Sequence, residues 1–169
     1  MAERGMTLRR PRRRSLEVVS NRPSAELGAL YREHHVAMVR LAHLLTGSNA
    51  VAEDLVHDVF VSLHGTIESA DNPAAYLRTA VVNRCRSYLR RSNLESRHQR
   101  VEPRVELPPE LDETWSALER IPERRRVALV LRFYQDMSVA EIAEVMDCRV
   151  GTVTSLIHRG LGSLREVLT

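Results

Sequence analysis

A polar face near the C-terminus has the side-chain types and the spacing to contact nucleic acid. Arginine can neutralise phosphates, whereas threonine, serine and histidine can hydrogen-bond base edges or the neighbouring backbone. We expect these residues to contact DNA, the alternative being an ordinary solvated helix face. They are Arg149, Thr152, Thr154, Ser155, His158 and Arg159.

Two helices and a tight turn within residues 138–165 must position this face. In the first helix, apolar residues recur three or four positions apart, at Val139, Ile142, Val145 and Met146. The second helix is expected to turn another set inward, at Val153, Ile157, Leu161 and Leu164. Asp147 opens the three-residue turn 147–149, and Asp tolerates the left-handed conformation that such a turn needs. Ala143 is small enough to let the helices cross closely. The pattern predicts a helix-turn-helix.

A second candidate is a compact acidic patch on the helix predicted over residues 49–64. Its members are Glu53, Asp54, His57 and Asp58, of which the last three are helix neighbours. Paired acids could serve acid–base catalysis, but no nucleophile, metal-ligand cluster or glycine-rich loop accompanies them. We therefore expect no enzyme, no metal site and no cofactor. The patch is either a solvated face or a docking surface for a basic partner.

An arginine-rich helix follows over residues 73–91, with Asn72 as its N-cap and Pro73 at its first position. Its predicted buried residues are Tyr76, Leu77, Ala80, Val81, Tyr88 and Leu89. Arginines and an amide line its outer side and suit contact with phosphates and unstacked bases. The candidates for this contact are Asn83, Arg84, Arg86 and Arg90.

The remaining elements predict an all-α protein of two helical modules. One module spans 24–91, and its first helix runs from Ser24 to Thr46 with a stripe of Leu27, Leu30, Tyr31, Met38, Leu41 and Leu45. The other module spans 112–169 and includes a helix that begins at Pro122 and turns Val127, Val130, Leu131 and Tyr134 inward. A flexible, proline-containing linker over 92–111 joins the modules. The arginine-rich tail 1–23 is expected to be disordered.

Charge is unevenly distributed along the chain. The 25 basic residues are all arginine and the net charge is only +3. Residues 78–104 hold eight arginines and two acids, whereas residues 49–71 hold five acids and no arginine. The separation suggests two surfaces for two partners. Cys85 and Cys148 lack zinc-ligand spacing and are expected to be buried thiols. No apolar run reaches the length of a membrane span and no signal sequence is evident, so we expect an intracellular protein without membrane insertion.

Taken together, these segments resemble a bacterial RNA polymerase sigma factor of the extracytoplasmic-function (ECF) class, in the sigma-70 family. The matching motifs are AEDLVHDVF at 52–60, AYLRTAVVNRCRSYLRR at 75–91, IPERRRVALVLRFYQDMSVAEIAEVMDCRVGTV at 121–153 and a closing LIHRGLGSLR. Each motif is moderately specific, and their order and spacing together are highly specific. The resemblance covers nearly everything except the tail and the linker.

The resemblance implies a role for each predicted surface. In the family, the helix matching 49–64 binds RNA polymerase core, with Asp54, His57 and Asp58 at contact positions. The helix from Pro73 and the loop before it match the reader of the −10 promoter element, and the helix-turn-helix matches the reader of the −35 element. The expected partners are polymerase core and promoter DNA, in the cytoplasm on the nucleoid. Many relatives are also held inactive by an anti-sigma factor, which is a further candidate partner.

Some residues depart from the family pattern. A basic residue is common at the position of Thr154, arginine at that of Leu156, and glycine at that of Asp147. The first two changes should weaken phosphate anchoring and alter which −35 sequence is read.

A second class of protein also fits part of the chain. Residues 138–165 resemble the DNA-binding domain of a LuxR-type transcriptional regulator. That reading leaves residues 49–91 unexplained. The two classes differ in one testable respect: a sigma factor directs initiation with purified polymerase core alone, whereas a regulator needs another sigma factor present.

Overall fold

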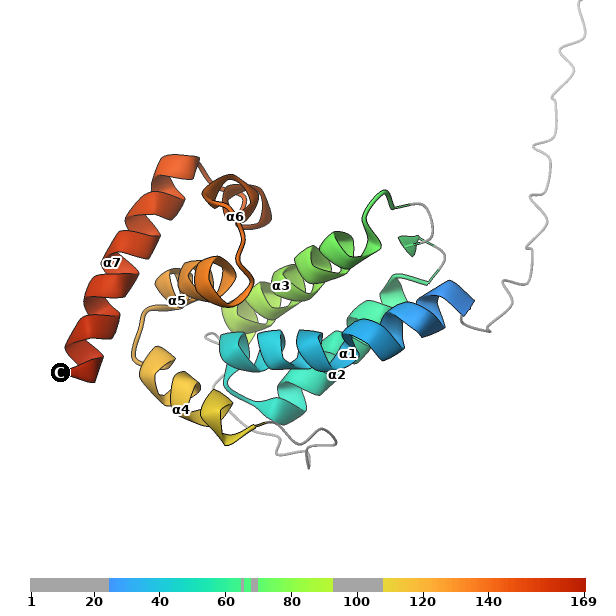
Figure 1. Cartoon of the computed structure of the whole chain (residues 1–169), viewed down its shortest axis with the longest axis horizontal. Helices are drawn as coiled ribbons and strands as arrows, with labels where there is room; N and C mark the ends of the chain where they lie inside the picture. The colour runs from blue at the N-terminus through green and yellow to red at the C-terminus, as the bar shows by residue number, and fades with distance from the viewer. Residues whose placement is uncertain (1–24, 65, 68–69, 93–107) are drawn as a thin grey trace, which may run out of the picture.

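The computed structural model describes residues 25–64, 66–67, 70–92 and 108–169. Within these ranges the regular structure is helical throughout, which confirms the all-α prediction (Figure 1). The predicted disordered tail, the Ser24 cap and most of the predicted linker lie outside the described residues. In chain order, the elements are α1 (Ala25–Thr46), α2 (Asn49–Ser62), α3 (Pro73–Ser92), α4 (Pro109–Leu118), α5 (Glu123–Leu129), the π-helical turn η2 (Val130–Tyr134), α6 (Val139–Val145) and α7 (Val150–Leu168).

Several helix ends follow directly from local sequence. Asn72 caps α3 by accepting a hydrogen bond from the backbone N–H of Ala75 at 3.0 Å. Ser138 and Glu141 form a reciprocal capping box at the start of α6. Asp147, in the turn between α6 and α7, has a φ of 49°, in the left-handed region. The predicted helix-turn-helix geometry is therefore present.

The N-terminal module consists of α1, α2 and α3 packed against one another. The buried line of α3 repeats every fourth residue through Leu77, Val81, Cys85 and Leu89. Two tyrosines predicted to be buried are exposed instead. Tyr76 lies one position off the buried line of α3 and is 44% exposed. Tyr31 stacks on His35 at a centroid distance of 4.4 Å and covers the edge of Phe60 from the surface.

The C-terminal module consists of α4 to α7, and two of its predicted core residues are misplaced. Leu161 is 40% exposed because a spacing of four drifts by about 40° per step on a helix, which carries it off the line set by Val153. Gly160 takes the inward position, and a Cβ there would lie 3.0 Å from the side chain of Leu129. Tyr134 is 42% exposed because the wider turn of η2, in which the N–H of Gln135 bonds the carbonyl of Val130, rotates it outward.

The two modules share one continuous core rather than standing apart. α1 packs against α4 and η2, and α3 packs against α6. Residues 109–111, predicted to be linker, are the first turn of α4, because Pro109 occupies a helix start where its missing N–H costs nothing. This helix lies along the corner between α1 and α2, so the second module begins against the first.

Candidate functional site

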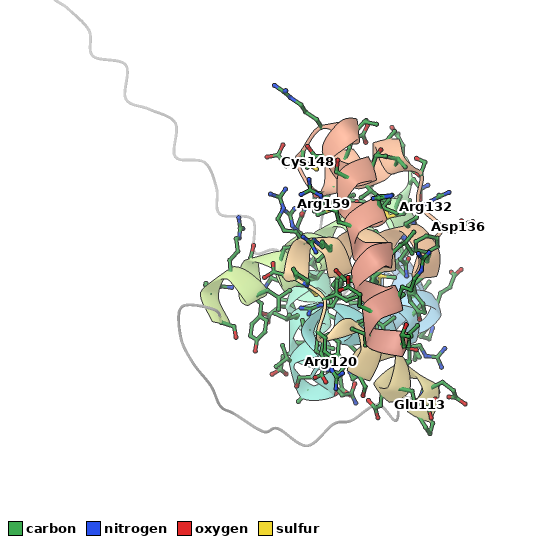
Figure 2. The ribbon with its side chains drawn as sticks, turned by 90° about the vertical axis from the view of Figure 1, so that its left-hand side faces the viewer. Glu113, Arg120, Arg132, Asp136, Cys148 and Arg159 are labelled. Atoms are coloured by element: carbon green, nitrogen blue, oxygen red, sulfur yellow. The ribbon has the colours of Figure 1, made fainter. Side chains whose placement is uncertain are left out.

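The outward face of α7 carries the six predicted DNA-contacting residues. Arg149, Thr154, Ser155, His158 and Arg159 are exposed, and Thr152 is half-buried. Figure 2 looks onto α7 and labels Arg159 and the turn residue Cys148. The helix begins at Val150 without a side-chain cap, and its positive dipole end lies beside Arg149. A cation next to a helix N-terminus favours a phosphate there.

The acidic patch lies on α2 as the sequence predicts. Asp54, His57 and Asp58 are exposed, whereas Glu53 is half-buried. Beside the patch, a cavity of about 420 Å³ between α1 and α2 is lined by Tyr31, Phe60 and Val61, among others. Burial lowers the pKa of His35, next to this cavity, and the charge of Glu53 partly offsets that effect. The surface therefore offers acids for a basic partner beside apolar side chains.

The predicted basic face of α3 is only partly free. Asn83 and Arg90 are exposed, and Arg90 donates a hydrogen bond to Ser87. Arg84 forms an ion pair with Asp58 of the acidic patch, with 2.5 Å between Nη2 and Oδ2. The distribution of charge along the sequence suggested that the acids of α2 and the arginines of α3 form two separate surfaces, but this ion pair joins them. Helix packing is the reason, since α2 and α3 lie against each other.

Arg86 does not lie on the free outer side of α3, contrary to the prediction. Its guanidinium donates to the backbone carbonyls of Val145 and Met146, at 3.0 and 3.1 Å. Burial, followed by the nearby charges of Arg90 and Arg124, lowers its pKa. The local periodicity of α3 could not reveal this partner, because the partner belongs to the other module.

Comparison with known proteins identifies the family. Residues 30–95 match the Sigma-70 region 2 family and residues 111–164 match the Sigma-70, region 4 family. The chain is 31% identical over 146 residues to an RNA polymerase sigma-E factor of Streptomyces coelicolor, covering 78% of this chain and 80% of that protein. It belongs to the ECF sigma factors of the sigma-70 family.

Other relatives agree with this assignment. The ECF RNA polymerase sigma factor SigM of Mycobacterium tuberculosis is 29% identical over 151 residues, covering 82% of this chain and 75% of that protein. Among solved structures, the sigma factor RpoE of Bartonella quintana, crystallised in complex with the anti-sigma factor NepR, has a TM-score of 0.68 at 23% identity and covers 85% and 96% of the two chains. CnrH, in complex with the cytosolic domain of CnrY, gives a TM-score of 0.62 at 24% identity, covering 84% and 86%. These two likenesses establish the fold.

A buried polar group joins the two modules of this sigma factor, and the sequence prediction did not single it out. Arg126 of α5 is 8% exposed and donates to the carbonyl of Leu45 in α1 at 3.3 Å. Its guanidinium carbon lies 4.8 Å from the ring centroid of Trp115. Burial lowers the pKa of Arg126, with Glu123 opposing that effect. One signal was available, because Arg126 precedes Val130 by four positions and therefore lies on the inward face of its helix.

His43 of α1 belongs to the same seam between the modules. It is 4% exposed, and its Nε2 lies 3.2 Å from a carboxylate oxygen of Asp112 in α4. Burial lowers the pKa of His43, and Asp112 partly offsets that shift. Packing around the ring and the nearby carboxylate of Asp112 together hold the imidazole at the seam.

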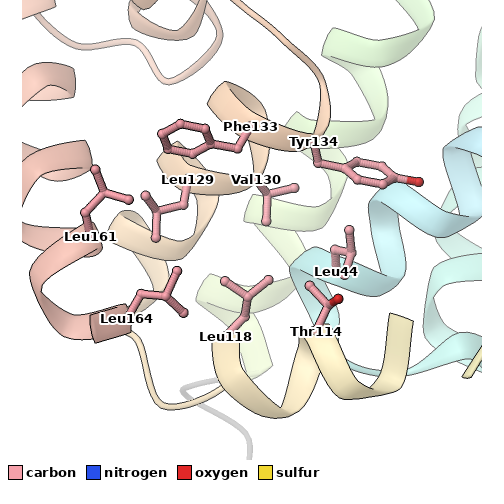
Figure 3. Close-up of a pocket in the computed structure, with 9 residues that line it drawn as sticks. All are labelled: Leu44, Thr114, Leu118, Leu129, Val130, Phe133, Tyr134, Leu161 and Leu164. Carbon is pink, nitrogen blue, oxygen red and sulfur yellow. The ribbon is translucent and has the colours of Figure 1, made fainter. Parts of the chain in front are cut away.

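An apolar cavity of about 450 Å³ opens beside this seam (Figure 3). Leu44 lines it from α1, while the other lining residues belong to the C-terminal module. Phe133, at its edge, is 63% exposed. The cavity brings an apolar surface of both modules together.

The described residues hold no cluster of three or more histidine, cysteine or acidic side chains placed to bind a metal. Both cysteines are free. Cys85 is buried, and burial raises the pKa of its thiol to about 12, whereas Cys148 is only half-buried, contrary to the prediction. Within the described part of the chain, no helix is both long and apolar enough to cross a bilayer.

Proposed function

We propose that this promoter-recognising sigma factor binds RNA polymerase core through the acidic face of α2, and reads the −10 element with α3 and the −35 element with α7. The core-binding residues would be Glu53, Asp54, His57 and Asp58. The N-terminal module, 24–91, would act as region two and the C-terminal module, 112–169, as region four. The observation that carries the proposal is that α2 exposes acids while α7 exposes a basic, hydroxyl-rich face on the other module.

The proposed mechanism is recruitment. Opposite charges steer a protein toward its partner and fix the register of docking, so the acids of α2 suit a basic surface of polymerase. On α7, the arginines would anchor phosphates while Thr152, Ser155 and His158 read the major groove. On α3, Asn83 and Arg90 are among the exposed groups available to a melted strand. No catalytic role is assigned to the chain, and its place of work would be the nucleoid in the cytoplasm.

An anti-sigma factor is proposed as a further partner. Two structural neighbours were solved in complex with partners: RpoE of Bartonella quintana with the anti-sigma factor NepR, and CnrH with the cytosolic domain of CnrY. A LuxR-type regulator is not favoured, because the match to Sigma-70 region 2 accounts for residues 30–95, which that alternative leaves without a role.

Reversing charge on α2 tests the docking face. Asp54→Arg with Asp58→Arg should abolish co-purification with polymerase core, because two attractions become repulsions against a basic partner. A matched control reverses two exposed acids of α1, Glu26→Arg with Glu33→Arg, which makes the same change in net charge. Circular dichroism should show the same helix content in both double variants. Wild-type core binding by the α2 variant, or equal loss in both, would contradict the assignment.

A further inference from the structure

Each module donates hydrogen bonds from one arginine to backbone carbonyls of the other module. Arg86, in the N-terminal module, donates to the carbonyls of Val145 and Met146 at the end of α6. Arg126, in the C-terminal module, donates to the carbonyl of Leu45 at the end of α1. The last carbonyls of a helix lack partners within the helix and form the negative end of its dipole. Each module therefore supplies a cation that caps a helix of the other.

The fit around Arg126 is close. Its guanidinium lies over the ring of Trp115. A Cβ added to Gly47, at the corner between α1 and α2, would lie only 2.1 Å from that same ring. Gly47 also has a φ of 76°, which glycine adopts without strain. The seam between the modules is thus a packed interface with a fixed geometry.

This arrangement holds the two candidate promoter-reading helices close together. Arg86 of α3 touches the carbonyl of Met146, and the four residues from there to Val150, where α7 starts, span at most about 14 Å. Elements named for positions −10 and −35 are about 25 base pairs apart, which is roughly 85 Å along a duplex at 3.4 Å per base pair. One molecule in this arrangement cannot place α3 and α7 on both elements of a straight promoter.

We propose that the reciprocal caps of Arg86 and Arg126 act together as a latch that holds this sigma factor in the closed arrangement of the structure, and that this latch must break before α3 and α7 can occupy both promoter elements. The inference about promoter reading rests on the proposed function, whereas closure itself does not. In the closed arrangement the guanidinium of Arg86 is bonded to the end of α6. It becomes available to DNA only when α6 moves away. Only the open state can place α3 and α7 on both promoter elements, so its population limits the apparent affinity for a promoter that carries both.

Closure can be measured without DNA or polymerase. Trp115 lies in the seam and is the only tryptophan in the sequence, so its emission should shift to the red when the modules separate. Arg86→Ala removes one cap at a site distinct from Trp115. It should raise the open fraction about ten- to a hundredfold, since hydrogen bonds to charged groups are of that strength. The full-length chain should then show a larger radius of gyration by small-angle scattering, together with the red shift.

Two further variants serve as controls for this measurement. Arg91→Ala removes an exposed arginine from the same helix and should change neither readout. Arg86→Lys keeps the charge but loses the fork that reaches two carbonyls, and should fall between wild type and alanine. The proposal is overturned if Arg86→Ala matches Arg91→Ala, or if the wild-type chain is already as extended as the alanine variant.

Arg126→Met tests the second cap and the consequence for promoter reading. The variant removes the buried charge while keeping an apolar side chain, and its holoenzyme should bind a promoter that carries both elements about tenfold more tightly, because more molecules are already open. If the variant loses helix content, Arg86→Ala decides the question of closure alone. An opened Arg126→Met chain with unchanged promoter affinity would overturn the claim that closure limits promoter reading. Absence of promoter binding in every variant would instead contradict the proposed function, and the scattering result would then test closure by itself.

Discussion

The two helices proposed to read the promoter differ in how much of their polar face is free. On α7, Arg149, Ser155, His158 and Arg159 all project into solvent. On α3, Arg84 is paired with Asp58 and Arg86 is bonded to the end of α6. Both faces look similar as sequence, with arginines among small polar residues. The difference teaches that an arginine on a polar helix face is available to DNA only where no other element of the fold supplies it with an acceptor.

The largest expected effect concerns the packed seam between the modules, where Gly47 contacts Trp115. Gly47→Ala should destabilise the protein by about 2–5 kcal/mol, because a Cβ would overlap the ring of Trp115 and the backbone is left-handed there. Gly162→Ala, in α7, meets nothing within 4 Å and should stabilise by about 0.5–1 kcal/mol. Thermal melting of both variants measures the contrast. Equal changes at the two positions would mean that the seam is not packed as described.

Substitutions on α7 should separate phosphate anchoring from base reading. Arg159→Ala should lower affinity for every −35 variant and reduce the salt dependence by about one unit of slope, whereas Ser155→Ala or His158→Ala should re-rank the variants by about 1–3 kcal/mol. Thr154→Arg, which adds a cation, should tighten binding largely without regard to sequence. A −35 library transcribed by each holoenzyme at two salt concentrations measures both effects. Re-ranking by Arg159→Ala, with uniform scaling by Ser155→Ala, would reverse this division of roles.

On α3, the free amide should matter for DNA opening. Asn83→Ala should reduce open-complex formation about tenfold, roughly 1.4 kcal/mol, with a smaller effect on initial promoter binding. Permanganate reactivity of melted thymines at saturating holoenzyme measures the loss. Arg32→Ala, exposed on α1 outside the proposed DNA-contacting helices, is the control. Undiminished melting by the Asn83 variant would remove this residue from the proposed −10 surface.

Acidic pH should destabilise the fold, both within the N-terminal module and at the seam between the modules. Burial lowers the pKa of His43 and of His35 below the ordinary value of 6.5. The unfolded chain therefore binds more protons than the folded one, and stability should fall as pH drops through and below about 6.5. Denaturant titrations between pH 7.5 and 5 on wild type and His43→Gln should show a shallower decline in the variant. Parallel pH profiles would show that His43 does not contribute.

The smallest effect concerns the ion pair between α2 and α3. A double-mutant cycle with Asp58→Ala and Arg84→Ala should give a coupling energy under about 1 kcal/mol, because both side chains are substantially exposed. The coupling should shrink further in high salt. A coupling of several kcal/mol would mean that Arg84 is held by the fold as firmly as Arg86.

Local features of the candidate site were predicted well, and long-range ones were not. Asn72, Ser138 and Asp147 carry their own signals for a helix start or a turn, and the structure uses each of them in that way. The acids of α2 and the polar residues of α7 also lie on the predicted faces. Tyr76 and Leu161 were misplaced, because a side chain at the edge of an apolar stripe is buried only if a neighbouring helix covers it.

The sequence by itself determined the helices, most of their limits and the polar faces, because caps, turns and apolar repeats act within a few residues. Only the tertiary structure decided which of the polar groups are free. Arg86 finds its acceptor in Val145, 59 positions away, and Arg126 finds one in Leu45, 81 positions away. No local periodicity encodes such pairs. They arise because helix ends need partners for their last carbonyls, and the packing of the two modules brings an arginine to each.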